Sequence, residues 1–269
     1  MQVSGYCRRM AHVDIPTTTL PLTAGAIPLV GFGTWQLRGE ECSAATLAAL
    51  EAGYRHLDTA TMYRNEAEVG RAIAESGVAR DEVFVTTKYN PRSGGDERAI
   101  LEQSLEALGT DHVDLWLVHA PADDNVRVWE SFVAAQSAGQ ARDIGVSNFS
   151  LGQVDRVREA TGVLPAVNQI EWRPSLYDAR VADGHASRGV VLEGYSALKG
   201  GSLRDPVVTR IADEVGRTPA QVLVRWHVQH DFVVIPRSSK AERVRSNADV
   251  GGFELSADQM AALDALGRG

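Results

Sequence analysis

The sequence predicts an α/β protein, and three observations support that class. Short runs rich in Val, Ile, Leu and Thr alternate with stretches in which apolar residues recur at helical spacing. Polar residues close three of these runs at Asp58, Lys88 and His119, at intervals of about 30 residues, the length of a strand–helix unit. With 269 residues, 44% of them hydrophobic, the chain can bury a large core.

Eight segments are predicted to be strands: 29–33, 55–60, 83–88, 113–119, 142–148, 166–171, 190–196 and 233–236. Helices fit between them, and eight parallel strand–helix units in about 250 residues are the usual size of a (β/α)8 TIM barrel. Because no linker rich in Pro, Ser or Gly divides the chain, we expect one domain over residues 1–269. Residues 1–15 match no element and are expected to form a loosely ordered extension.

Local signals mark the ends of several elements. Ala24 and Gly25 separate two short strand-like runs within residues 17–30, which predicts an N-terminal β-hairpin that closes the bottom of the barrel. Leucines recur at helical spacing over residues 101–108, and Gly109 follows them. This pattern predicts a helix that ends at a left-handed glycine.

Two helix starts near the C-terminus are equally well marked. Thr218 followed by Pro219 is typical of an N-cap and the first helical position. Ser256 with Gln259 three residues later forms the pattern of a capping box. The second of these starts predicts a C-terminal helix.

Composition and charge exclude several classes of partner. Lys and Arg number 27 against 35 Asp and Glu, so the net charge of −8 disfavours nucleic acid and anionic membrane surfaces. No apolar run approaches the roughly 20 residues that a membrane-spanning helix needs. Residues 10–16 lack the apolar core of a signal peptide, so we expect a cytoplasmic protein in which Cys7 and Cys42 are ordinary thiols.

Four ionisable side chains are candidates for catalysis. Active sites of such barrels lie at the C-terminal ends of the strands, where Asp58, Lys88 and His119 stand, and Tyr63 follows in the loop after Asp58. Each has a structural alternative: a rim ion pair for Asp58 and Lys88, a hydrogen-bonded core histidine, and a surface phenol. Four independent structural roles on neighbouring strand ends would be a coincidence, so the pattern favours one shared active site.

The motifs around these residues resemble the aldo-keto reductase family, in particular short prokaryotic members of the diketogluconate and methylglyoxal reductase type. GYRHLDTATMYRNEAEVG, TTKYNP, LVHAP, GVSNF, NQIEWRP, GYSALKGG and IPRSSKAERVRSN follow one another in the family's order. The resemblance spans nearly the whole chain and implies reversible hydride transfer between a nicotinamide cofactor and a carbonyl. It makes Tyr63 the proton donor and gives it Asp58, Lys88 and His119 as partners.

Physical chemistry explains why this reaction needs these residue types. Hydride addition turns a carbonyl oxygen into an alkoxide, which must receive a proton from a positioned acid. A free phenol has a pKa of about 10, and a nearby ammonium lowers it by favouring the phenolate. Lys88 would act on Tyr63 in this way, Asp58 would hold Lys88, and His119 would orient the carbonyl oxygen.

The sequence lacks the common motifs for binding a dinucleotide cofactor. Gln36 stands where a G-x-G-x-x-G fingerprint requires its third glycine, so a Rossmann site is not expected. The resemblance implies that polar groups hold the nicotinamide amide, that an aromatic ring stacks on the nicotinamide, and that a glycine-containing loop follows the pyrophosphate. The implied contacts are Thr34, Ser147, Asn148, Gln169, Tyr195, Ser196, Leu198, Gly200 and Gly201. A helix N-cap is the alternative role for Ser147 and Asn148.

A cationic segment follows the last predicted strand. In the family it grips the adenosine 2′-phosphate, so NADPH is expected rather than NADH. The implied contacts are Pro236, Arg237, Ser238, Ser239, Lys240, Arg243 and Asn247. A solvated basic helix is the alternative, and two departures from the family pattern, Arg237 and Ser246, leave tolerance of NADH open.

The sequence indicates less about how a small carbonyl substrate is bound. Trp35, Tyr89 and Asn90 follow predicted strands and are expected to line the pocket. Ala120 stands where most relatives have tryptophan, which suggests a wider pocket.

No metal site is expected elsewhere in the chain. His227 and His230 are three residues apart but have no third ligand nearby, so we expect them at the surface. We also expect a monomer.

Two other functions remain open at this point. A catalytically silent barrel could bind NADP(H) as a redox sensor or an accessory subunit, although a sensor need not keep Asp58, Tyr63, Lys88 and His119. A different barrel enzyme, such as an isomerase or an aldolase, could use Lys88 to form a Schiff base. That chemistry requires a neutral, free lysine, whereas Asp58 favours the charged form.

Overall fold

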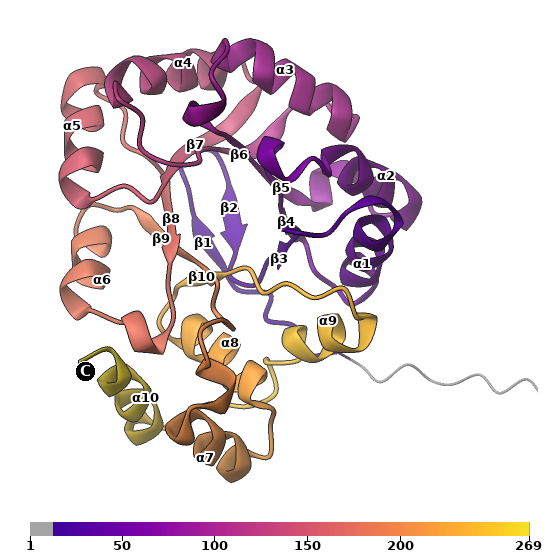
Figure 1. The fold of residues 1–269 in the computed structure, drawn as a ribbon, viewed down its shortest axis with the longest axis vertical. Coiled ribbons are helices and arrows are strands. Elements are labelled where there is room, and N and C mark those ends of the chain that lie inside the picture. The colour runs from indigo at the N-terminus through magenta and orange to yellow at the C-terminus, as the bar shows by residue number, and fades with distance from the viewer. Residues whose placement is uncertain (1–12, 269) are drawn as a thin grey trace, which may run out of the picture.

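The computed structural model describes residues 13–268 and contains a closed barrel of eight parallel strands (Figure 1). Each strand pairs with the next along the chain, from β3 to β10. The ring closes where Val30 and Val234 form a parallel bridge, with a hydrogen bond of 2.9 Å from the Gly31 amide to the Val234 carbonyl oxygen. The predicted (β/α)8 barrel is therefore confirmed.

All eight predicted barrel strands are present. They are β3 (Phe32–Gly33), β4 (His56–Asp58), β5 (Phe84–Tyr89), β6 (Val113–Val118), β7 (Ala141–Ser147), β8 (Val167–Glu171), β9 (Val191–Tyr195) and β10 (Val233–Val234). Most are fully or largely buried, because helices cover the outside of the ring and the barrel interior is filled with side chains.

Ten α-helices lie in the described chain, most of them in the layer around the barrel. They are α1 (Gly39–Glu51), α2 (Glu66–Ser76), α3 (Glu97–Leu108), α4 (Asn125–Ser137), α5 (Leu151–Thr161), α6 (Ala179–Ala186), α7 (Pro206–Val215), α8 (Pro219–Gln229), α9 (Ala241–Ala248) and α10 (Ala257–Asp264). Gly109 ends α3 with a φ of 68°, and Thr218 and Ser256 form the capping boxes of α8 and α10. These three local predictions are confirmed.

The predicted hairpin consists of β1 (Thr19–Pro21) and β2 (Ala26–Pro28), which pair antiparallel. Its turn is held by Asp143, whose Oδ1 accepts hydrogen bonds from the amides of Thr23 and Ala24 at 3.0 and 3.1 Å. Because Asp143 lies in the first half of β7, the hairpin covers the end of the barrel opposite the strand C-termini.

The chain just before the hairpin departs from the expected loose extension. Asp14 accepts hydrogen bonds on its carbonyl oxygen from the amides of Val250 and Gly251, and its own amide donates to Asp249 Oδ1 at 3.0 Å. Ile15 packs against the core. These contacts tie residues 13–15 to the segment after α9, whereas residues 1–12, which include Cys7, lie outside the described chain.

Aromatic side chains fill two parts of the core. Trp116 on β6 stacks on Phe132 of α4 with ring centroids 3.6 Å apart. A second cluster surrounds the fully buried Trp226 of α8. This cluster corrects the surface position expected for His227, which is fully buried and lies within hydrogen-bond distance of the carbonyl oxygens of Leu223 and Trp172.

The neighbouring histidine is also a structural residue. His230 Nε2 lies 2.9 Å from Asp264 Oδ1, and its ring stacks on Phe232. Within residues 13–268, no group of three or more His, Cys, Asp or Glu side chains could hold a metal ion.

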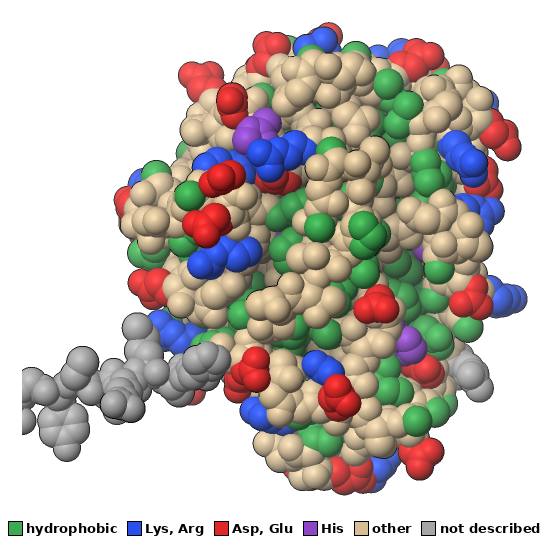
Figure 2. Space-filling view, turned by 180° about the vertical axis from the view of Figure 1, so that it is seen from behind, with side chains coloured by type: hydrophobic (Ala, Val, Ile, Leu, Met, Phe, Trp, Pro, Cys, Tyr) green, Lys and Arg blue, Asp and Glu red, His purple; other side chains and the backbone are tan. Residues whose placement is uncertain are grey.

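Two properties of the helices and the surface are relevant here: the capacity to span a membrane and the clustering of basic side chains. In the described chain, no helix is long and apolar enough to cross a membrane. Figure 2 shows that basic side chains on that face are dispersed, several of them beside acidic ones.

Cys42 is a free, buried thiol whose pKa is raised by burial to about 11, as expected of an unreactive cysteine.

Candidate active site

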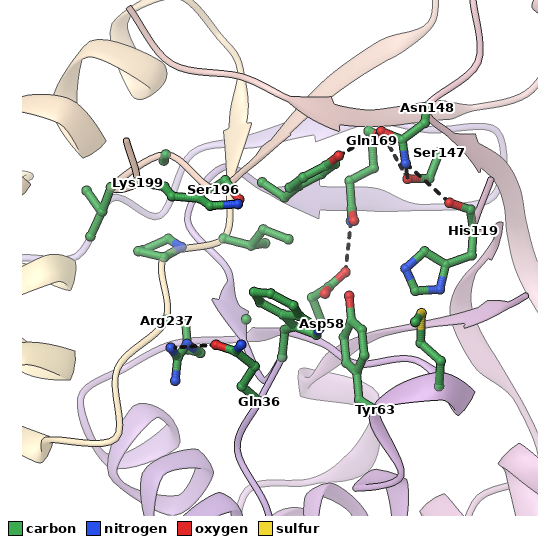
Figure 3. Close-up of a pocket in the computed structure, with 18 residues that line it drawn as sticks. Gln36, Asp58, Tyr63, His119, Ser147, Asn148, Gln169, Ser196, Lys199 and Arg237 are labelled. Carbon is green, nitrogen blue, oxygen red and sulfur yellow. Dashed lines mark hydrogen bonds between the residues drawn. The ribbon is translucent and has the colours of Figure 1, made fainter. Parts of the chain in front are cut away.

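The four candidate catalytic side chains meet at the C-terminal end of the barrel. Figure 3 shows Asp58, Tyr63 and His119 at the cavity. Lys88, the fifth residue of β5, donates from Nζ to Asp58 Oδ1 at 2.6 Å and to the Thr59 carbonyl oxygen at 2.9 Å. Lys88 Nζ also lies 3.4 Å from the Tyr63 hydroxyl oxygen. Both Lys88 and Asp58 are almost completely buried, so their ion pair is screened from water.

Tyr63 is placed by a short 3-10 helix, Thr61–Tyr63, that follows β4. The Thr61 hydroxyl donates to the Lys88 carbonyl oxygen at 2.9 Å, and Arg38 Nη1 donates to the Tyr63 carbonyl oxygen at 3.0 Å. Only 9% of Tyr63 is exposed, and its side chain points into the cavity. The phenol is therefore fixed by its backbone and presents its hydroxyl between Lys88 and open space.

Burial and charge act in opposite directions on this pair. Burial raises the pKa of Tyr63, and the ammonium of Lys88 opposes that rise by favouring the phenolate. Burial would lower the pKa of Lys88, but Asp58 and the other nearby anions outweigh it, and the lysine pKa is raised overall. Lys88 is therefore charged, and its predicted action on Tyr63 has the right sign.

His119 follows β6 and faces Tyr63 edge to face, with ring centroids 5.6 Å apart. Burial, with a smaller contribution from Lys88, lowers the pKa of His119 to about 3. The imidazole is therefore neutral near pH 7. Its Nδ1 has no hydrogen-bond partner within the described chain.

Asp58, Tyr63 and His119 line a cavity of about 620 Å³, whereas Lys88 is not among its lining residues and contacts Asp58 and Tyr63. The other residues of the cavity come from the ends of β3 and β7 to β10 and from the loops that follow them. The lining residues are Gly33, Trp35, Gln36, Asp58, Met62, Tyr63, His119, Ser147, Asn148, Gln169, Tyr195, Ser196, Ala197, Leu198, Lys199, Ile235, Pro236 and Arg237. A cavity of this size at the C-terminal face is where barrel enzymes bind small molecules.

Polar groups at the ends of β7 to β9 form a connected network (Figure 3). The Ser147 hydroxyl donates to the Gln169 carbonyl oxygen at 2.8 Å, and Gln169 Nε2 donates to Asp58 Oδ2, also at 2.8 Å. The Tyr195 hydroxyl donates to Asn148 Oδ1 at 2.8 Å. This network leads from the cavity wall to the carboxylate that holds Lys88.

The alternative role of Ser147 and Asn148 as a helix cap is wrong. Ser150 is the N-cap of α5, and its hydroxyl accepts from the amide of Gln153. Asn148 instead adopts a left-handed backbone with φ of 62°, and Ser196 does the same at the end of β9 with φ of 57°. Such conformations in residues other than glycine are uncommon and concentrate at functional sites.

The expected cofactor residues divide into two groups. Ser147, Asn148, Gln169, Tyr195, Ser196, Leu198, Pro236 and Arg237 line the cavity. Outside the cavity lining are Thr34, Gly200, Gly201, Ser238, Ser239, Lys240, Arg243 and Asn247. The Thr34 side chain is fully buried and donates to the Asp58 carbonyl oxygen at 2.9 Å, so it supports the site from behind.

The cationic segment lies beside one end of the cavity. Arg237 lines the cavity and donates from Nη2 to Gln36 Oε1 at 3.2 Å. Lys240 and Arg243 are exposed at the start of α9, whereas Arg245 lies 3.5 Å from Glu51 on α1. Arg237, Lys240 and Arg243 are therefore exposed cations without an acidic partner in the described chain, whereas Arg245 is close to Glu51.

Two predicted substrate residues are displaced from the cavity. The prediction that Tyr89 lines the pocket is wrong. Tyr89 follows the inward-facing Lys88 on the same strand and therefore points outward. There it packs against Phe132, and its hydroxyl oxygen lies 3.4 Å from Glu97 Oε1. Asn90 caps a short 3-10 helix by accepting from the Arg92 amide at 3.1 Å, and it does not line the cavity.

Other residues determine the apolar wall of the pocket. Trp35 lines the cavity as predicted and is 47% exposed, whereas Ala120 does not line it. The sequence analysis missed Met62, which is 48% exposed and adjoins Tyr63. Its position next to a candidate catalytic residue could have identified it.

Comparisons with known proteins identify the family. The family model described as the aldo/keto reductase family matches residues 29–268. An aldo-keto reductase of Mycolicibacterium vanbaalenii is 49% identical over 261 residues, which cover 95% of this chain and 93% of that protein. One from Mycolicibacterium smegmatis is 46% identical over 250 residues, with 91% of each chain covered.

Solved structures lead to the same family. An aldo/keto reductase from Brucella melitensis has a TM-score of 0.89 and 37% identity, covering 94% of this chain and 99% of that one. An aldose reductase from Schistosoma japonicum has a TM-score of 0.86 and 31% identity, covering 92% and 91%. The chain belongs to the aldo/keto reductase family. Membership makes it an oxidoreductase of carbonyl substrates in a family that uses nicotinamide cofactors.

Proposed function

We propose that the protein is an NADPH-dependent carbonyl reductase that converts aldehydes or ketones into alcohols, with Tyr63 as the general acid. One observation carries the proposal: the Tyr63 hydroxyl lies 3.4 Å from a buried, charged lysine and opens onto the cavity. This arrangement suits proton donation to a substrate oxygen, because the ion pair behind the phenol is buried.

The residues of the chain divide the proton chemistry between them. A bound nicotinamide supplies the hydride that reduces the carbonyl carbon. Tyr63 donates its proton to the carbonyl oxygen, and the Lys88 ammonium stabilises the phenolate that remains. Asp58 keeps Lys88 charged and in place at 2.6 Å, and solvent then returns a proton to Tyr63.

His119 positions the substrate oxygen. A neutral imidazole can donate one hydrogen bond to that oxygen without adding a second positive charge beside Lys88. Trp35 and Met62 provide exposed apolar surface in the same cavity, which favours substrates with an apolar or aromatic group next to the carbonyl.

The cavity residues fit a nicotinamide nucleotide. The side chains of Ser147, Asn148 and Gln169 provide hydroxyl and amide groups for the nicotinamide amide, and the Tyr195 ring offers a surface for stacking. The left-handed backbone at Asn148 and Ser196 is consistent with close approach of a ligand. Lys240 and Arg243 are proposed to bind the 2′-phosphate that distinguishes NADPH.

The Schiff-base alternative is not favoured by the structure. Lys88 Nζ has three oxygen neighbours, namely Asp58 Oδ1, the Thr59 carbonyl and the Tyr63 hydroxyl, and its pKa is raised. An amine that is charged and fully engaged is a poor nucleophile. The silent NADP(H)-binding barrel, by contrast, remains an outcome of the test.

The first experiment is a tryptophan-fluorescence titration with NADPH and NADH, followed by a panel of aldehydes, ketones and dicarbonyls monitored for NADPH oxidation. Tyr63→Phe should lower turnover by about 10²- to 10⁴-fold, the typical contribution of a general acid, and leave the Kd for NADPH nearly unchanged. Tyr89→Phe is the matched control, since that hydroxyl lies outside the cavity.

Each outcome distinguishes the candidate functions. Comparable turnover in Tyr63→Phe contradicts the assignment of the acid. Binding of NADPH without turnover across the panel supports a redox sensor or an accessory subunit. No binding of either nucleotide overturns the proposal. Light scattering of the same sample tests the monomer that we also propose, and cell fractionation tests the cytoplasmic location.

A further inference from the structure

A second ionisable pair lies inside the barrel and takes no part in the proposed mechanism. Glu193 on β9 and His56 on β4 are both fully buried, and Glu193 Oε1 lies 3.8 Å from His56 Nε2. Neither carboxylate oxygen of Glu193 has a hydrogen-bond partner within the described chain. A buried carboxyl group with so few partners is costly to ionise.

The histidine is held firmly and does not act as a counter-ion. His56 Nε2 lies 3.1 Å from the Thr86 hydroxyl oxygen, and Nδ1 has no partner within residues 13–268. The ring lies against Gly31, where an added Cβ would lie 2.5 Å from Nδ1. Burial lowers the pKa of His56 to about 3, so the imidazole is neutral beside Glu193.

Glu193 is nevertheless connected to the catalytic groups. In the sheet register its Cα pairs with Gln169, the residue whose side chain donates to Asp58 Oδ2 at 2.8 Å. Three titratable groups lie close enough to interact electrostatically with Glu193: Asp58 and His56 from β4 and Lys88 from β5. The charge of Glu193 in turn raises the pKa of Tyr63. On its flanking strands, its register partners are the uncharged Gln169 of β8 and Val233 of β10.

These surroundings favour a neutral carboxyl group. Burial and the repulsion of Asp58 raise the pKa of Glu193 to about 8, and Lys88 and the Gln169 side chain only partly oppose them. Near neutral pH, Asp58 is then the principal anion that faces Lys88.

We propose that Glu193 is a positioning residue that controls the charge balance around Lys88 and Tyr63. It is neutral in the resting enzyme, and its ionisation adds a second buried negative charge that acts on Lys88 and Tyr63. The kinetic consequence rests on the proposed function. Alcohol oxidation needs Tyr63 as phenolate, so the ionised Glu193 suppresses oxidation in alkaline solution while the phenol needed for carbonyl reduction is retained.

The decisive variant is Glu193→Gln, which keeps the shape of the side chain and removes its charge. In this variant the alkaline rise of kcat for alcohol oxidation should move to lower pH by about one unit, so that oxidation on the rising limb is about tenfold faster than in the wild type. Glu254→Gln is the control, because that carboxylate is 83% exposed. Superimposable pH profiles of wild type and Glu193→Gln would overturn the proposal.

A second readout does not need turnover. The ultraviolet absorbance of the Tyr63 phenolate, obtained as wild type minus Tyr63→Phe, should titrate at lower pH in the Glu193→Gln background. If no substrate in the panel reacts, the proposed function fails but this titration still tests the role of Glu193. An unchanged phenolate titration refutes that role.

If Glu193→Gln does not fold, the wild-type protein provides the test. Infrared spectra with ¹³C-labelled glutamate should show a protonated carboxyl band at pH 6.5 that disappears as the pH passes through about 8. Glu66→Gln removes the signal of Glu66, a second buried glutamate whose pKa is raised. Absence of the remaining band at pH 6.5 overturns the proposal.

Discussion

Lys88 combines two properties that rarely occur together: it is fully buried and it is charged. The cost of removing an ammonium from water is offset by Asp58 at 2.6 Å and by the Thr59 carbonyl oxygen at 2.9 Å. The result is a fixed positive charge at the Tyr63 hydroxyl that needs no rearrangement when a substrate arrives. Preorganisation of this kind is a major source of catalysis in enzymes.

A prediction at the residue scale concerns preference for NADPH. Arg243→Ala should raise the Kd for NADPH about 10- to 100-fold and leave that for NADH nearly unchanged, because a charged hydrogen bond to the 2′-phosphate contributes roughly 1.5–3 kcal/mol. Fluorescence titration with both nucleotides measures the two constants.

Arg245→Ala on the same helix is the matched control. Arg245 lies 3.5 Å from Glu51, so its removal should affect both nucleotides little. Equal weakening of NADPH and NADH by Arg243→Ala would exclude a role in 2′-phosphate recognition.

Individual site residues were predictable to different degrees. Asp58, Lys88 and His119 could be found because each lies at or next to the C-terminal end of a strand, and the closed barrel brings all strand ends to one rim. Tyr89 could not be placed correctly from its proximity to Lys88 alone, since successive side chains of a strand point to opposite faces. Glu193 was missed because it lies within an apolar run and its partners come from distant strands.

At the scale of elements, the loops after β7 and β9 hold the site in position. Asn148 and Ser196 follow these strands in left-handed conformations, and Ser150 begins α5 two residues after Asn148. The cap therefore fixes where the helix starts and leaves the side chains of Ser147 and Asn148 free to face the cavity. Sequence analysis considered only Ser147 and Asn148 for this cap, and the backbone shows that Ser150 takes the role.

A prediction for the hairpin follows from its single carboxylate anchor. Asp143→Ala removes the acceptor of the Thr23 and Ala24 amides and should lower the free energy of unfolding by about 1–3 kcal/mol, the usual effect of losing a buried hydrogen-bond partner. Urea denaturation measures this loss.

The proposed reductase activity below the unfolding transition should not change in Asp143→Ala, because the hairpin lies at the end of the barrel opposite the cavity. Asp143→Asn keeps one acceptor oxygen and should be less destabilising. An Asp143→Ala protein as stable as the wild type would contradict the proposed anchoring.

At the scale of the whole molecule, closure of the barrel makes the interior a dry, polar site rather than a simple apolar core. Asp58, Lys88, Gln169 and Glu193 all lie inside it with at most 2% exposure. Low local dielectric strengthens the interactions between these groups and makes their protonation states interdependent. The same burial gives the protein a characteristic dependence of stability on pH.

The last prediction concerns acid unfolding. Burial lowers the pKa values of His56 and His119 to about 3 and that of His227 to about 4, against an unfolded value of 6.5. The unfolded chain therefore binds more protons between these values, and the stability contributed by the neutral histidines is present above pH 6.5 and lost as pH falls toward 3–4. Glu193, with a raised pKa, acts in the opposite direction between pH 4.5 and about 8.

Urea midpoints at pH 7 and pH 4.5 test this account when they are compared between variants. The fall in midpoint should be smaller in His227→Gln than in the wild type, since the variant has no imidazole to protonate at that position. An identical fall in both proteins would show that His227 does not contribute to acid unfolding.

The sequence by itself determined the barrel, the order of its strands, the helix ends and the identity of the residues at the strand termini. These depend on local periodicity, capping and turn chemistry, which are encoded over a few neighbouring residues. Only the tertiary structure decided that Tyr89 faces away from the cavity, that His227 is buried, and that Glu193 lies beside His56. Those facts depend on which side chains meet across the closed barrel, and contacts between distant strands leave no signal in the spacing of a single chain.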